Sequence, residues 1–353
     1  MAVRRRIIPG SKAREGDRRR PRPPRRPTLA VVVPVYNEAP TVERFHELLK
    51  GSLRRTSARA YILYINDGST DGTEQALDAL SAGDPKVRVL HLSRNFGQQA
   101  ALTAGLDAVD TDAVIMMDGD GEHPPGLIPD MVEAFLEGHE VVLTRRSRDR
   151  RASRLKRWSA SAFFRMINWL GSVPIEPEAA DFRLLSRTAL EAVRGMRERR
   201  RFLRGLVAWS GFNPVVLPYE QGERLGGVSK WSFWRLLGLA QDAILSFSAK
   251  PLLFSYFCGV GMVALAIAAG AWAIAEGSLG RVAQPTVLAL GVSSLVLLVG
   301  GVLALLTGIV GSYLGQVSEE VRQRPIYVVR RTTGSTDGSG RNRPEEPKDA
   351  YVR

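Results

Sequence analysis

Apolar runs of five to seven residues alternate with amphipathic stretches from residue 28 to about residue 117. Continuous aliphatic runs of this length are typical of buried strands, and the stretches between them have the length and spacing of helices. The strands are predicted at 29–35, 61–65, 87–92 and 113–117, and the helices at roughly 41–53, 71–82 and 98–108. Strands that alternate with helices indicate an α/β domain with a mostly parallel sheet, and such sheets bind ligands beyond the carboxyl ends of their strands.

The last third of the chain carries two long uncharged stretches, at 253–275 and 286–310. Each is long enough to cross a hydrocarbon core of about 30 Å as a helix, so we predict two transmembrane helices. The link between them has only Glu276 and Arg281 as charged residues, whereas the outer flanks are rich in Lys and Arg. This asymmetry predicts that both termini and the α/β domain are cytoplasmic. The alternative is a soluble core that packs two very apolar helices together.

These patterns divide the chain into six predicted segments. They are a disordered basic tail at 1–27, the α/β domain at 28–229, an interfacial amphipathic helix at 230–250, two transmembrane helices within 251–312, a cytoplasmic segment at 313–330 that returns to the α/β domain, and a disordered tail at 331–353. The tail at 1–27 is rich in Arg and Pro and has little apolar surface to bury. The helix at 230–250 mixes tryptophan and phenylalanine with Lys230 and Arg235, as interfacial helices do, although an ordinary surface helix remains an alternative.

The net charge of +13 is concentrated near segments that a membrane or a phosphorylated substrate would approach. Basic residues gather in the tail at 1–27 and at 145–157 and 197–204. Lipid headgroups and phosphates explain these clusters better than a nucleic acid does, because no nucleic-acid-binding motif is present. The single cysteine, Cys258, excludes an intramolecular disulfide and fits a cytoplasmic α/β part.

Two carboxylates, Asp118 and Asp120, follow directly after the predicted strand at 113–117. Oxygen ligands suit Mg²⁺ or Mn²⁺, which also bind substrate phosphates, so the turn predicts a metal site that neutralises a diphosphate. Glu122 is either a third ligand or an exposed side chain. His123 is more typical of a residue that shapes the loop than of a metal ligand or a base. Asn37-Glu38 and Asn66-Asp67 end two other strands and are expected at the same edge of the sheet.

The order of these motifs resembles the family 2 glycosyltransferases of the GT-A fold over roughly residues 28–330. The matching elements are Val33-Pro34-Val35-Tyr36-Asn37-Glu38, Asn66-Asp67-Gly68-Ser69, Asp118-Gly119-Asp120, Asp181-Phe182-Arg183-Leu184, Arg201-Phe202-Leu203-Arg204 and Ser229-Lys230-Trp231. The resemblance is greatest to the branch that transfers sugars to polyprenyl phosphate, which includes the dolichol-phosphate mannose synthases and the bacterial GtrB-like glucosyltransferases. Gln221 departs from that pattern, because the lipid-phosphate enzymes often carry arginine there, and Asn66 replaces a frequent second aspartate.

The resemblance implies a GT-A, Rossmann-like catalytic domain at 28–229 and a role for each matching residue. The nucleotide would be bound by Pro34, Tyr36, Glu38, Asp67 and Asp118, with Asp67 on the base, and the metal by Asp118, Asp120 and Glu122. The pyrophosphate and acceptor phosphate would meet Arg145, Arg148, Arg204, Arg224, Ser229 and Lys230. Asp120, Asp181 and Arg183 would be catalytic, with Asp181 either a base or an orienting partner of Arg183.

The implied reaction is an inverting transfer of a hexose from a nucleotide sugar to polyprenyl phosphate on the cytoplasmic leaflet. We favour UDP-glucose as donor and GDP-mannose next. The protein is expected in the inner membrane as a homo-oligomer, and relatives include tetramers. One alternative is a processive polysaccharide synthase, but Arg154 stands where the glutamine of the Gln-x-x-Arg-Trp motif would be. Another is a non-catalytic membrane scaffold, against which the intact Asp118 and Asp120 argue.

Overall fold

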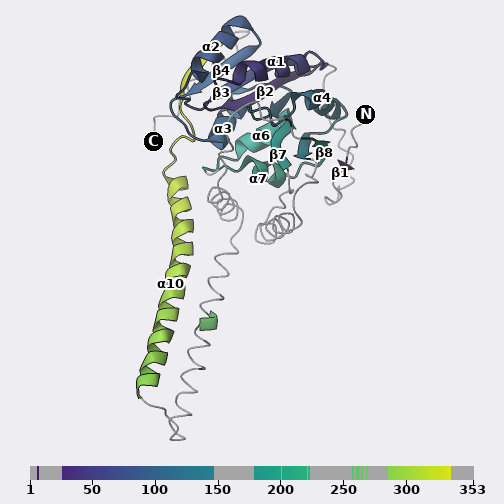
Figure 1. Ribbon diagram of the computed structural model, residues 1–353. Helices are drawn as coiled ribbons and strands as arrows, with labels where there is room; N and C mark the ends of the chain where they lie inside the picture. The colour runs from purple at the N-terminus through teal and green to yellow at the C-terminus, as the bar shows by residue number, and fades with distance from the viewer. Residues whose placement is uncertain are drawn as a thin grey trace. The chain divides into compact units, whose positions relative to one another are not determined.

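The chain forms two units, which are described separately. In the computed structural model, the described residues are 6–7, 26–146, 179–199, 201–220, 222, 257, 260–262, 264, 268 and 285–334 (Figure 1). The first unit comprises residues 1–164, 173–232 and 325–353, and the second comprises residues 165–172 and 233–324. The first unit holds the predicted α/β domain, and the second holds the predicted membrane segments.

A nine-stranded sheet in the order β1-β8-β6-β7-β5-β2-β3-β4-β9 forms the centre of the first unit. Its strands are β1 (Arg6–Ile7), β2 (Thr28–Val35), β3 (Arg59–Asn66), β4 (Val87–Leu92), β5 (Ala113–Met116), β6 (Val141–Arg146), β7 (Ala179–Ser186), β8 (Pro214–Tyr219) and β9 (Val329–Thr333). The pairings make β2, β3, β4, β5, β6 and β8 point one way, and β1, β7 and β9 the other. The predicted α/β class and mostly parallel sheet are therefore confirmed.

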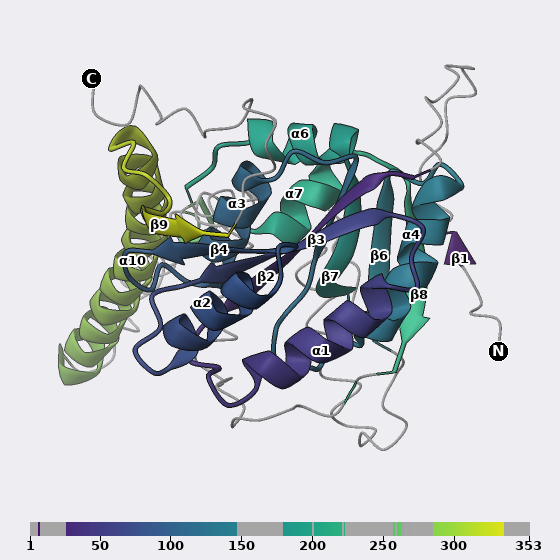
Figure 2. The ribbon, with the colours of Figure 1, turned by 90° about the horizontal axis from the view of Figure 1, so that it is seen from above.

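Helices cover both faces of this sheet (Figure 2). One face carries α1 (Val42–Leu53), α2 (Thr73–Gly83), the short 3₁₀ helix η1 (Pro125–Leu127) and α4 (Ile128–Leu136). The other face carries α3 (Gln98–Ala108), α6 (Arg187–Gly195) and α7 (Leu203–Trp209). Because neither face of the central strands meets water, both sets of alternating side chains must be apolar, which explains the continuous aliphatic runs.

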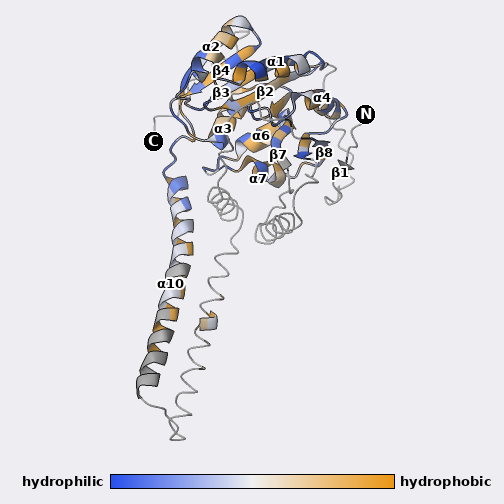
Figure 3. Ribbon diagram, in the orientation of Figure 1, coloured by the Kyte–Doolittle hydropathy of each residue, from blue (hydrophilic) through white to orange (hydrophobic). Residues whose placement is uncertain are grey.

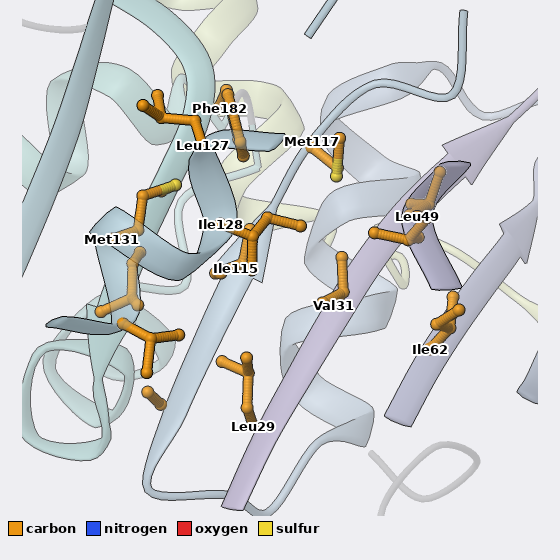
Figure 4. Packing of buried hydrophobic residues seen from close by; sticks show 14 of the residues in the cluster. Leu29, Val31, Leu49, Ile62, Ile115, Met117, Leu127, Ile128, Met131 and Phe182 are labelled. Carbon is orange, nitrogen blue, oxygen red and sulfur yellow. The ribbon is translucent and has the colours of Figure 1, made fainter. Parts of the chain in front are cut away.

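The larger core lies between the sheet and the face covered by α1, α2 and α4. Leu29 and Val31 of β2 and Ile115 of β5 point into it, against Leu49 of α1 and Met131 of α4 (Figure 4). All five side chains are buried, and so is Phe45 in the first turn of α1. Burying a side chain of this size contributes roughly 1.5–3 kcal/mol relative to exposure, so this layer fixes the sheet that carries the strand-end loops.

The second unit contains the helix α10 (Pro285–Val321). Its segment Leu298–Val321 is long and apolar enough to cross a membrane, and it is the one helix of that kind among the described residues. Its polar residues gather near the C-terminal end (Figure 3). The helix overlaps the second predicted span at 286–310 but continues to Val321, beyond the predicted end at 310. Most of the first predicted span and the whole of the predicted interfacial helix at 230–250 lie outside the described residues.

Two short strands fall in segments that we expected to be disordered, so those expectations were wrong at these residues. Arg6 and Ile7 form β1, which pairs with Val216 and Val215 of β8. Strand β9 continues to Thr333, inside the predicted tail at 331–353. Composition misses both, because an edge strand is held by backbone hydrogen bonds and needs little apolar surface. In β9 ion pairs add to this, since Arg331 contacts Glu74 and Asp78 of α2.

Candidate active site

The loops after β2 and β3 form the predicted nucleotide site. These strands are parallel neighbours, with Val35 paired to Asn66, so Pro34, Tyr36 and Glu38 come beside the loop at 66–70. Asn37 joins the two loops: its backbone N–H donates to the Ser69 hydroxyl at 3.0 Å, and its side-chain oxygen accepts the Thr70 N–H at 2.8 Å. The sequence therefore brings the expected residues together, on a pair of loops that hold each other in place.

Asp67 is buried and fastens a third loop. Its two carboxylate oxygens accept the backbone N–H groups of Phe96 and Gly97 at 2.8 and 2.9 Å, and burial raises its pKa. Gly68 makes the close contact possible, because it has a φ of 65° and a Cβ there would lie 2.3 Å from the carbonyl carbon of Arg94. The predicted base contact of Asp67 remains a prediction; the bonds in this structure hold the loop between β4 and α3.

Asp118 and Asp120 lie on the turn after β5. One oxygen of Asp118 accepts the side-chain amide of Gln98, the first residue of α3, at 2.5 Å. The backbone N–H of Asp118 donates to Nδ1 of His123 at 3.0 Å. His123 is buried and stacked on Phe182, and burial lowers its pKa to about 4, so the ring is neutral. His123 therefore shapes the turn, as the sequence favoured.

The two carboxylates suit a divalent cation. Burial and the negative charges of Asp181 and Asp120 raise the pKa of Asp118 to about 7, as expected for a buried carboxyl group close to other carboxylates. In the part of the chain that the structure describes, no three His, Cys, Asp or Glu side chains gather as a metal cluster. Two carboxylates still fit Mg²⁺, which commonly takes its other ligands from water and substrate phosphates.

Glu122, the third predicted metal ligand, forms an ion pair with Arg146. Its carboxylate oxygen lies 2.6 Å from the guanidinium of Arg146, at the end of β6. Its backbone N–H donates to Asp120 at 3.0 Å, which tightens the turn. The expected ligand set of three carboxylates is therefore not assembled here, because the ion pair with Arg146 holds the Glu122 side chain.

An arginine–aspartate network lies beside this turn. Strand β7 places Arg183 opposite Met116 of β5, and its side chain is only 1% exposed. Its guanidinium donates to Asp181 at 2.9 Å and to the carbonyl of Ala180 at 3.0 Å. Two guanidinium nitrogens of Arg204 in α7 donate hydrogen bonds to Asp181, at 3.2 and 2.9 Å. Asp181 thus connects a buried arginine to one that is 30% exposed.

The charges around Asp181 bear on its two predicted roles, as a base or as an orienting partner. Burial alone would raise its pKa, but Arg204 and Arg183 hold it at about 2. A carboxylate with so low a pKa is a weak proton acceptor near pH 7. The geometry therefore favours Asp181 as an orienting partner for Arg183 and Arg204.

The remaining predicted phosphate contacts are distributed unevenly over the structure. Arg145 is the last residue but one of β6 and pairs with Ala179, whereas Arg148, Arg224, Ser229 and Lys230 lie outside the described residues. Sequence reasoning missed Arg146 and Gln98. In the Arg145-Arg146 pair, successive strand residues point to opposite faces, so only the register of β6 tells which one meets the turn. Gln98 is the first residue of the helix after β4, and a polar residue at that position could have been predicted to reach the turn after β5.

Comparison with known proteins identifies the family of this chain. A family model, Glycosyl transferase family 2, matches residues 30–194. The uncharacterized glycosyltransferase YkcC of Bacillus subtilis is 33% identical over 308 residues, which cover 86% of this chain and 94% of that protein. The chain belongs to glycosyltransferase family 2. This family 2 glycosyltransferase is also 36% identical to the SfII prophage-derived bactoprenol glucosyl transferase of Shigella flexneri. The match covers 86% of this chain and 98% of that protein.

Among solved structures, the mannosyltransferase PcManGT from Pyrobaculum calidifontis, in complex with GDP-Man and Mn²⁺, is similar to this family 2 glycosyltransferase. It is 17% identical with a TM-score of 0.38, and the match covers 84% of this chain and 87% of that one. That likeness is too distant to place any residue.

Proposed function

We propose that this family 2 glycosyltransferase moves glucose from UDP-glucose to a polyprenyl phosphate, with inversion at the anomeric carbon. The proposal is supported by the bactoprenol glucosyl transferase that is 36% identical over nearly its whole length. GDP-mannose is the next donor to consider. The structural observation that carries the proposal is the Asp118–Asp120 turn beside the Asp181–Arg204 pair, which puts metal-binding carboxylates next to a fixed cation.

Each part of this site has a task that its own geometry supports. Asp118 and Asp120 would hold Mg²⁺ or Mn²⁺, which supplies positive charge for the leaving diphosphate when bound. Arg204 is held by Asp181 in one orientation and remains 30% exposed, so it can present a cation to a phosphate without first losing side-chain entropy. Pro34, Tyr36 and Glu38 would line the nucleotide site.

The acceptor explains why a strong base is unnecessary. A lipid monophosphate is already an anion near pH 7, so its oxygen can attack the anomeric carbon directly, and direct attack inverts the configuration. Asp181 with a pKa of about 2 fits a mechanism without general-base catalysis. Arg145, Arg148, Arg224, Ser229 and Lys230 are proposed to meet the acceptor phosphate or the pyrophosphate, since two anionic substrates need cations between them.

The membrane part of the proposal extends the apolar helix α10. We propose a second span at 253–275, with both termini and the catalytic domain cytoplasmic, so that the lipid product forms on the cytoplasmic leaflet of the inner membrane. The lysine- and arginine-rich outer flanks support this orientation. A homo-oligomer, such as a tetramer, would enlarge the small membrane core that two helices provide.

A donor screen tests the function. The full-length protein in lipid nanodiscs is incubated with polyprenyl phosphate, Mn²⁺ or Mg²⁺, and radiolabelled UDP-glucose, GDP-mannose or UDP-N-acetylhexosamine, and the organic phase is counted. Label from UDP-glucose is expected there, and Asp120→Ala is expected to abolish it. The matched control is Asp110→Asn, which changes an exposed carboxylate before β5. The absence of labelled lipid with every donor would contradict the proposal, and full metal-dependent activity of Asp120→Ala would refute the metal assignment.

A further inference from the structure

Strand β9 is tied to the catalytic sheet by more than its backbone. The chain leaves α10 at Val321 and enters β9 at Val329, which runs antiparallel to β4 and pairs Arg331 with His91. Arg331 grips Asp78 of α2 with two nitrogens, at 2.6 and 3.2 Å. The hydroxyl of Thr333 donates to the same carboxylate at 3.1 Å. Asp78 therefore receives contacts from two side chains of β9, and Arg331 also donates to Glu74 at 2.7 Å.

Asp78 in turn contacts a buried histidine that the catalytic chemistry does not use. His91 is fully buried on β4; its Nε2 lies 3.1 Å from Asp78, and its Nδ1 lies 3.1 Å from the side-chain nitrogen of Asn66. A carboxylate only accepts and an amide nitrogen only donates, so the proton sits on Nε2 and Nδ1 is the acceptor. Burial and Arg331 lower the pKa of His91, which keeps the ring neutral at pH 7.

Asn66 connects His91 to the loops of the proposed nucleotide site. Because its nitrogen donates to His91, its oxygen faces the other way and accepts the backbone N–H of Ser69 at 3.0 Å. The Ser69 hydroxyl accepts the N–H of Asn37, on the loop after β2. The donor or acceptor role of each group along this path is set by its neighbour, so a change of role at one hydrogen bond changes the role required at the next.

We propose that the C-terminal strand β9 positions the donor-binding loop at 66–70 through a path of side chains from Thr333 and Arg331 to Asp78, His91 and Asn66, here named the His91 relay. The inference rests on the proposed function, which places the nucleotide at this loop. His91 and Asp78 are positioning residues: they touch no substrate and act by fixing the amide of Asn66. Gly334 shows how closely β9 is seated, because a Cβ there would lie 2.5 Å from the carbonyl oxygen of Val87.

Asp78→Asn tests the relay without changing its shape. Arg331 donates to both oxygens of Asp78, and His91 and Thr333 share one of them, so an NH₂ group in either position faces a donor and at least one of these hydrogen bonds is lost. Either orientation weakens the hold of residue 78 on His91 or on Arg331, and with it the support of the Asn66 amide, whose oxygen accepts the Ser69 N–H. A second variant, Arg331→Gln with Thr333→Val, removes the ion pair and the hydroxyl contact of β9 with Asp78 and keeps its backbone pairing.

Arg330→Gln is the matched control, because Arg330 also lies on β9 but contacts Glu74 and not Asp78. In the full-length protein, hydrogen exchange of residues 66–70 is measured together with KM and kcat for UDP-glucose and the thermal midpoint. Both relay variants are expected to speed exchange of the Ser69 amide and to raise KM about three- to tenfold, the effect of losing one or two hydrogen bonds. The value of kcat should stay within about twofold, because only binding is weakened. The control should change neither exchange nor KM.

The outcomes separate this inference from the proposed function. Unchanged exchange at 66–70 in both relay variants would overturn the inference, whatever their activity. Faster exchange with an unchanged KM would overturn the link to the donor. A thermal midpoint lowered equally in the control and the relay variants, with equal changes in KM, would show a merely structural role for β9. If the wild-type protein turned over no nucleotide sugar, the proposed function would fail, while the exchange data would still decide whether β9 holds the loop.

Discussion

Replacing Asp181 by asparagine is expected to destabilise the catalytic domain and to slow transfer strongly. Asp181 accepts three hydrogen bonds, one from Arg183 and two from Arg204. Asparagine keeps the shape but removes the charge and presents an NH₂ group to guanidinium donors. Arg183 then remains a cation at 1% exposure with no anion against it, and its Nε already lacks a partner among the described residues.

The magnitude follows from how deeply each partner is buried. Removing one member of a buried ion pair costs about 3–5 kcal/mol, whereas an exposed pair contributes about 0–1 kcal/mol. Arg183 belongs to the first class, but Asp181 is 14% exposed and Arg204 30% exposed, so water screens part of the loss. We therefore expect a loss of about 2–3 kcal/mol, between the exposed class and the buried class.

The assay compares denaturant unfolding of Asp181→Asn with Arg187→Gln, which breaks the exposed pair between Arg187 and Asp110. The control should lose less than about 1 kcal/mol. Transfer should fall mainly in kcat, because Arg204 loses its orientation. Equal stability losses in the two variants would refute the reasoning that a buried charge is left uncompensated.

The pH dependence of Asp181→Asn separates orientation from base catalysis. The pKa of Asp181 is lowered from 3.8 to about 2 by its arginines, so its contribution to stability is present above about pH 4 and is lost as the pH falls towards 2. Acid unfolding of the wild-type protein should therefore be steeper in this range than that of the variant. The kcat of the wild-type protein should show no inflection from Asp181 between pH 5 and 8. An inflection there that Asp181→Asn removes would mean that Asp181 acts as a base.

Three further changes test other parts of the structure. Mn²⁺ at a hundredfold excess over its Kd should stabilise the wild-type protein by about 2.7 kcal/mol and so raise its thermal midpoint. The midpoint of Asp118→Asn should not rise. An equal rise in both proteins would exclude Asp118 as a ligand. Gly68→Ala should raise KM for UDP-glucose, because its Cβ would lie 2.3 Å from Arg94, and an unchanged KM would mean that the loop is not at the donor site. Phe45→Ala should cost about 3–5 kcal/mol in denaturant unfolding, since the ring is fully buried; a loss under about 1 kcal/mol would contradict the core packing.

The pattern of the sequence predicted the parallel part of the sheet because each strand there is buried on both faces. The runs at 29–35, 61–65, 87–92 and 113–117 lie in β2, β3, β4 and β5 or at their ends. The edge strands escaped prediction, because β1 and β9 are short, polar and held by pairing. Nothing in Arg331 or Thr333 indicated that Asp78, more than 250 positions earlier in the chain, would be their partner.

The candidate site divides in the same way. Asp118, Asp120 and the Asn66-Asp67 pair were proposed as site residues because the strand ends of such sheets concentrate ligand-binding groups. The partners of those groups depend on register and could not be read from spacing. The pairing of Glu122 with Arg146 requires β6 to end beside the turn after β5. The double grip of Arg204 on Asp181 joins α7 to β7, and only the folded chain brings them together.

The central claim is that the acceptor is a polyprenyl phosphate and the sugar is glucose. The most direct measurement incubates the protein in nanodiscs with carbon-13-labelled UDP-glucose, polyprenyl phosphate and Mn²⁺, and analyses the lipid extract by mass spectrometry and NMR. We expect a polyprenyl-phosphate hexose that carries the full label, with an anomeric configuration opposite to that of the donor. Labelled glucose found only free in water or in a polymer, or a lipid product with the donor's own configuration, would contradict it.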